Sequence, residues 1–89
     1  MSQPTPRGRP DVVFRQLADE WVLYDPGSNQ IHVLNLSAAL VWTSCTGEMT
    51  VDQIVDEVRS SYPDEPERAV VERDVDDALE RLGQEGLLL

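Results

Sequence analysis

Hydrophobic and polar residues alternate with a period of about two between residues 12 and 35, a pattern typical of β-strands that bury one face. The alternation falls into three short runs: residues 12–17, 20–25 and 30–34. Ala18 and Asp19 leave a tight link between the first two runs, and residues 26–29 form a turn in which Pro and Gly favour the required backbone angles. The pattern predicts an antiparallel meander of three strands.

The period changes to that of an α-helix after residue 34. A first helical stretch carries apolar or small residues at Leu36, Ala39, Leu40 and Thr43. Asn35 or Ser37 can cap its start, and we expect it to end at Gly47.

A second helix follows with a clear start signal. Thr50 and Gln53 have the spacing of a capping box, in which each side chain bonds the backbone N–H of the other residue. Behind them is an apolar stripe formed by Val51, Ile54, Val55 and Val58. We expect this helix to run to about Tyr62, because Pro63 stops it.

The third helix is expected to begin at a second capping-box spacing, between Asp64 and Glu67, and to reach residues 83–86. Its apolar positions fall within about 100 degrees of one another on a helical wheel. These positions are Val71, Val75, Ala78, Leu79 and Leu82. Glu72 flanks the stripe on one side, and Asp74 and Arg81 flank it on the other.

The length of 89 residues suits one domain with one hydrophobic core. Residues 1–10 hold three of the six prolines and no apolar periodicity, so we expect a flexible tail followed by a folded domain at residues 11–89. The predicted fold class is α+β, with a three-stranded antiparallel sheet followed by three helices. Because three strands cannot bury themselves, the helices must pack on one face of the sheet.

The charge balance excludes several partners. Seventeen acidic residues stand against seven Arg and no Lys, which gives a formal net charge of -10. Nucleic acids and anionic membranes attract clustered basic residues, so neither is an expected partner. The sequence contains neither an apolar run of the ~20 residues that a bilayer requires nor a secretory signal, so we expect a cytoplasmic protein.

The residues with reactive side chains form no recognisable catalytic set. His32 is the single histidine and Cys45 the single cysteine, and neither has a partner at a spacing typical of a metal site or a nucleophile. The carboxylates lie on predicted polar faces, where their pKa values would not be tuned for proton transfer. Ser37 follows Leu36 in a chain that begins with strands, which excludes an acyl carrier protein. We therefore expect no enzyme activity, metal or cofactor.

The shape of the predicted fold indicates a different function. A third strand with an unpaired outer edge, beside an amphipathic helix, offers free backbone donors and acceptors to an extended peptide. The alternative is an edge that Gln30 and His32 close without any ligand.

Several stretches of the sequence resemble the PqqD family. They are Trp21-Val-Leu-Tyr-Asp-Pro-Gly, Ile31-His-Val-Leu-Asn, Ala38-Ala-Leu-Val-Trp, Gly47, Thr50-Val-Asp-Gln-Ile-Val, Asp74-Val-Asp-Asp-Ala-Leu-Glu-Arg-Leu and Glu85-Gly-Leu-Leu. The resemblance covers residues 12–89, and its most specific part is Leu34-Asn35, followed by Trp42 and then Gly47. It departs from the family in the short link at Ala18 and in the length of the third helix.

The resemblance implies a winged helix-turn-helix-like domain that recognises ribosomally made, post-translationally modified peptides. Such a domain binds the leader of a precursor peptide as an added strand and delivers it to a modifying enzyme, such as a radical SAM protein, or to a leader peptidase. Quinone-cofactor and lasso-peptide pathways both use such domains. The implied peptide-binding residues are those of the third strand and of one helix wall: Gln30, Ile31, His32, Val33, Leu34, Val71, Asp74, Val75, Ala78, Leu79 and Leu82.

Two other classes share this predicted fold. A DNA-binding winged helix would need basic residues where the third helix carries Glu72, Asp74, Asp76, Asp77 and Glu80. A non-catalytic interaction or regulatory module that binds an enzyme but no leader peptide remains the alternative.

Overall fold

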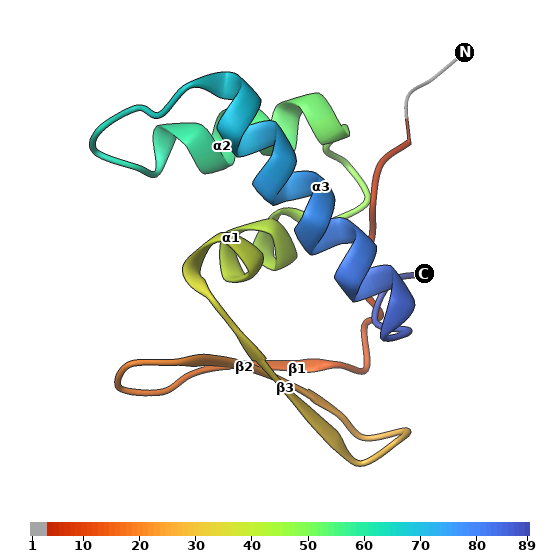
Figure 1. Cartoon of the computed structure of the whole chain (residues 1–89). Helices are drawn as coiled ribbons and strands as arrows, with labels where there is room; N and C mark the ends of the chain where they lie inside the picture. The colour runs from red at the N-terminus through yellow and green to blue at the C-terminus, as the bar shows by residue number, and fades with distance from the viewer. Residues whose placement is uncertain (1–3) are drawn as a thin grey trace.

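The computed structural model describes residues 4–89 and begins with the predicted sheet. Its strands are β1 (Val13–Gln16), β2 (Trp21–Asp25) and β3 (Gln30–Leu34). They pair antiparallel in the order β1-β2-β3, so β1 and β3 are the two edges (Figure 1). The meander inferred from the alternation is therefore confirmed, with each strand within one residue of its expected bounds.

Three helices follow the sheet: α1 (Leu36–Ser44), α2 (Val51–Ser60) and α3 (Arg68–Gln84). The start signals of the first two are confirmed. The Asn35 side chain accepts the N–H of Ala38 at 2.8 Å, and both bonds of the capping box between Thr50 and Gln53 are present. The α+β class, with three strands before three helices, is correct.

The predicted start of α3 is wrong. The helix begins at Arg68, and its N-cap residue Glu67 makes no capping bond through its side chain. Glu65 has a φ of 42°, which is outside the range of an α-helix. A helix that starts at Asp64 is impossible with this backbone, so Pro66 lies before α3 and not in its first turn. The first two helices also end earlier than expected, at Ser44 and Ser60.

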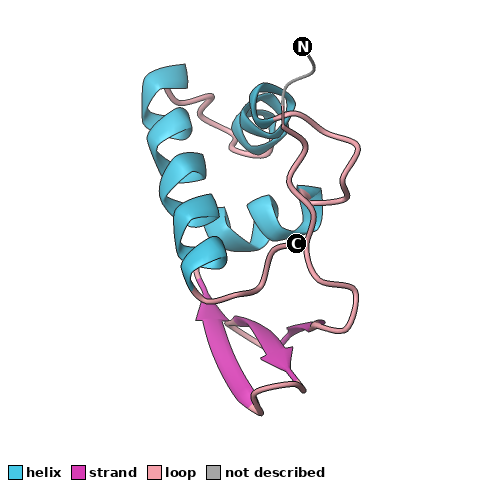
Figure 2. Ribbon diagram, turned by 90° about the vertical axis from the view of Figure 1, so that its right-hand side faces the viewer, coloured by secondary structure: helices cyan, strands magenta, loops and turns pink. Residues whose placement is uncertain are grey.

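The core lies between the helices and one face of the sheet, and the helices lie on the same side of it (Figure 2). Leu23 and Leu34 contribute from the strands. The helices and the C-terminal segment contribute the other large buried side chains: Val41, Ile54, Val55, Val58, Val71, Val75, Leu82 and Leu87. Within residues 4–89 no helix covers the opposite face of the sheet, where Val13, Ile31 and Val33 are exposed and Val22 and Tyr24 are half-buried.

The N-terminal segment belongs to the fold from about Pro6, which corrects the expected boundary at residue 11. The backbone N–H of Gly8 donates to the carbonyl of Cys45 at 3.0 Å, and the backbone N–H of Arg9 donates to the carbonyl of Leu87 at 2.9 Å. Gly8 also lies so close to the ring of Trp42 that a Cβ there would be 2.5 Å from a ring carbon. The expected tail also includes residues 1–3, which lie outside the described residues.

The side chain of Arg9 ties this segment to the sheet. Its guanidinium binds both carboxylate oxygens of the buried Asp25, at 3.0 and 3.1 Å, and also bonds Asp11 and the carbonyl of Gly86. The pKa of Asp25 is held below its usual value by Arg9 and, to a smaller degree, by the hydroxyl of Ser28. The contact therefore stabilises the fold through the ionised form of Asp25.

We predict that Arg9→Gln lowers the stability of the protein at neutral pH. Because the folded pKa of Asp25 is depressed, the contribution of the pair is complete above the unfolded pKa of Asp and is lost as the pH falls through the folded pKa. Urea unfolding should show a gap between wild type and Arg9→Gln at pH 7 that closes in acid. The control is Arg7→Gln, since the exposed Arg7 makes no side-chain ion pair with the residues that the structure describes. A gap independent of pH would contradict this role of Arg9.

Candidate functional site

Strand β3 forms one edge of the sheet. Its inner side pairs with β2, and no strand of residues 4–89 pairs with its outer side. Unpaired backbone groups on such an edge are open to another extended chain. The orientation of each residue decides which groups these are.

Hydrogen bonds elsewhere in the sheet fix that orientation. The N–H of Leu17 donates to the carbonyl of Glu20 at 2.7 Å, so Glu20 directs its backbone groups toward β1. Since the direction alternates along a strand, Leu23 directs its groups toward β3, where its partner is His32. His32 is therefore paired inward, and its two neighbours are not. The outward groups are the N–H and C=O of Ile31 and Val33.

A contact from α3 supports the same orientation independently. Arg81 donates from Nη2 to the carbonyl oxygen of Val33 at 2.9 Å, so this carbonyl points away from β2 and toward α3. A carbonyl oxygen has two lone pairs, and a ligand N–H can therefore bond it beside Arg81. The last turns of α3 thus border the free edge of β3.

The side chains that join α3 to β3 form a short polar chain. Arg81 donates from Nε to Glu85 Oε1 at 3.2 Å, and the second oxygen of Glu85 lies 3.0 Å from Nδ1 of His32. His32 is largely buried and faces the helices, on the sheet face opposite to Ile31 and Val33. These contacts hold the end of α3 at a fixed place along the strand.

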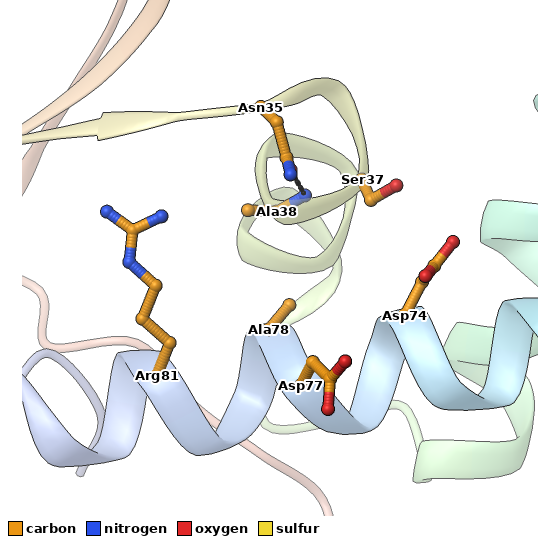
Figure 3. Close-up of a pocket in the computed structure, with 7 residues that line it drawn as sticks. All are labelled: Asn35, Ser37, Ala38, Asp74, Asp77, Ala78 and Arg81. Atoms are coloured by element: carbon orange, nitrogen blue, oxygen red, sulfur yellow. Dashed lines mark hydrogen bonds between the residues drawn. The ribbon is translucent and has the colours of Figure 1, made fainter.

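A pocket of about 180 Å³ lies beyond the C-terminal end of β3, between α1 and α3 (Figure 3). Its lining residues are Asn35, Ser37, Ala38, Asp74, Asp77, Ala78 and Arg81. Asp74 and Asp77 give it an acidic side, and Arg81 marks its end nearest the strand (Figure 3). A peptide that leaves the β3 edge in this direction would cross an acidic, polar surface.

The expected helix wall is largely wrong, because its apolar stripe is the core. Val71, Val75 and Leu82 are 0–1% exposed and cannot contact a ligand in this fold. Ala78 and Asp74 do line the pocket, and Leu79 is partly buried against the core. The strand residues occupy the edge as expected, although their contact with a peptide stays a prediction.

Sequence reasoning missed five pocket residues: Asn35, Ser37, Ala38, Asp77 and Arg81. A signal for two of them was present, because Asp77 and Arg81 lie three and seven positions after Asp74 and so share one helix face with it. The polar residues that flank the apolar stripe on the helical wheel, and not the stripe itself, therefore indicated where the pocket lies.

The chemistry of the remaining groups is unfavourable for catalysis. Burial raises the pKa of the Cys45 thiol to about 11, so the nucleophilic thiolate is absent at neutral pH. Within residues 4–89, no group of three His, Cys, Asp or Glu side chains could hold a metal ion. None of the helices described is long and apolar enough to cross a membrane. What the site offers is a row of backbone hydrogen-bonding groups.

The fold and the site define a class of small domain in which a helix borders one of the two sheet edges, that of β3. The family model for coenzyme PQQ synthesis protein D (PqqD) matches residues 20–88. The chain belongs to the PqqD family. No curated protein matches it.

Two solved structures share the fold at 27% sequence identity. One is TbiB1 in complex with the TbiA(beta) leader peptide, with a TM-score of 0.75 over 92% of this chain and 93% of that one. The other is a lasso peptide synthetase B1 complexed with the leader peptide, with a TM-score of 0.78 over 96% and 98%. Both similar proteins are therefore leader-peptide complexes of nearly the same length.

Proposed function

We propose that this chain binds the leader segment of a ribosomally synthesised precursor peptide as a strand added to β3, beside α3. The observation that carries the proposal is the outward direction of the backbone groups of Ile31 and Val33 at the open edge. Added strands gain affinity from main-chain hydrogen bonds of this kind. The two solved leader-peptide complexes, which match almost the whole chain, support the same ligand class.

The proposal includes presentation of the bound peptide to an enzyme. The chain itself is proposed to be non-catalytic, because its buried thiol and its exposed carboxylates form no acid-base or nucleophile set. The partner enzyme is a modifying enzyme, such as a radical SAM protein, or a leader peptidase, in a lasso-peptide or quinone-cofactor pathway. This step takes place in the cytoplasm, where precursor peptides are synthesised.

Tryptophan fluorescence tests the proposal. Trp21 is half-buried and pairs with Leu34 at the end of β3, so a strand added at this edge should change its emission. The titrants are leader segments of short peptides encoded next to the gene, and the control is each segment with its residues in scrambled order. Saturable binding of a native segment and none of its scrambled form is expected. If the chain binds an enzyme encoded next to it tightly but responds to no leader segment, it is an interaction module and the proposal is wrong.

A further inference from the structure

Two apolar side chains on the open edge of β3 are exposed to solvent. Ile31 is 66% exposed and Val33 is 52% exposed, on the sheet face that carries no helix. Each has an apolar or aromatic neighbour on β2, since Ile31 pairs with Tyr24 and Val33 with Val22. On the other side each lacks a strand neighbour within residues 4–89. Polar side chains normally occupy the solvated face of a sheet, so apolar side chains this exposed at an open edge indicate a surface that a partner covers.

We infer that Ile31 and Val33 select the ligand by its side chains: the bound peptide carries apolar, preferably β-branched or aromatic, residues at two alternate positions that cover this pair. The inference rests on the proposed function and adds to it the sequence pattern of the ligand. It assigns recognition to the sheet face away from the helices.

The geometry of a strand leads to this pattern. A strand added to β3 continues the sheet, and its side chains alternate between the two faces whichever way it runs. Side chains on the outer face lie beside Ile31 and Val33 at the ordinary distance of cross-strand pairs, where aromatic and β-branched residues stabilise one another. The residue between them faces α3, where Arg81 and Glu85 form a charged surface. The expected order along the ligand is apolar, polar, apolar.

Charge argues against a second copy of the chain as the occupant. Two β3 edges could pair with each other, but each copy has a formal net charge of -10, so the copies repel. A short peptide avoids this repulsion. It also leaves β1 uncovered, because β1 lies on the opposite edge of the sheet.

The test is selection from a displayed library of randomised seven-residue peptides, with the whole chain as the target. Enriched sequences should show apolar residues at two positions that are two residues apart. Selection on Ile31→Lys should change one of these positions to Asp or Glu and leave the other apolar. Val13→Lys is the control. It places the same charge on the same face of the sheet but on the opposite edge strand β1, so it should leave the selected pattern unchanged. A peptide selected on wild type should bind Ile31→Ala about two- to five-fold more weakly.

The outcomes separate the inference from the function on which it rests. Enriched peptides that lack the alternate apolar positions, or a pattern that Ile31→Lys does not change, overturn the inference while the proposed function stands. No enrichment over an unrelated target overturns both. A dimer in sedimentation equilibrium that Ile31→Lys dissociates would make a second copy the occupant and overturn the choice of a peptide.

Discussion

Val75→Glu is expected to unfold the protein. Val75 has no exposed surface and lies on the face of α3 that packs into the core. A carboxylate at this position would be buried without a partner, which costs about 3–5 kcal/mol of the free energy of unfolding. Domains have about 5–15 kcal/mol in total, and a domain of 89 residues is expected near the lower end, where this loss removes most of the stability. Far-ultraviolet circular dichroism with urea titration measures it.

The matched control is Val70→Glu, which makes the same change on the same helix. Val70 is 53% exposed, and we expect an effect within about 0.5 kcal/mol. If Val75→Glu folds as stably as Val70→Glu, α3 packs through a different face, and Val75 does not belong to the core.

Two proline substitutions at adjacent positions of β3 are expected to have opposite effects. His32 directs its N–H toward β2, so His32→Pro removes a sheet hydrogen bond and leaves the carbonyl of Leu23 without its donor, at a cost of about 1–3 kcal/mol. Val33 directs its N–H outward, so Val33→Pro should leave the fold intact. Under the proposed strand addition this N–H donates to the ligand, so Val33→Pro should bind a leader segment about ten-fold more weakly.

Urea unfolding and fluorescence titration on both variants distinguish the two effects. The opposite assignment, in which Val33→Pro is unstable and His32→Pro is not, would mean that the strand presents its other residues outward. If both variants fold normally and bind the peptide normally, the ligand does not bind as a strand added to β3.

The strands and the starts of two helices were predictable because their signals are local. Alternation around Leu23 and the capping box at Thr50 depend on neighbours within four positions. The start of α3 was not predictable in this way, because the spacing of Asp64 and Glu67 fits a capping box while the backbone at Glu65 excludes one.

The site was harder to predict because it depends on contacts between distant segments. The N-terminal residues bond through backbone groups, for example from Arg9 to Leu87, and such bonds leave no pattern in the sequence. A helical wheel shows that Val75 and Asp74 lie on different faces of α3, but it does not show which face borders β3. The contact between Arg81 and Val33 spans 48 positions and decides that question.

Amide hydrogen exchange, resolved by residue, tests the central claim most directly. The N–H groups of Ile31 and Val33 should exchange fast in the free chain and become at least about ten-fold slower with a bound leader segment. The N–H of His32 should be protected in both states, and those of Phe14 and Gln16 at the opposite edge should be protected in neither. Protection that arises at Phe14 and Gln16, or no change at Ile31 and Val33 under saturating peptide, would contradict strand addition at β3.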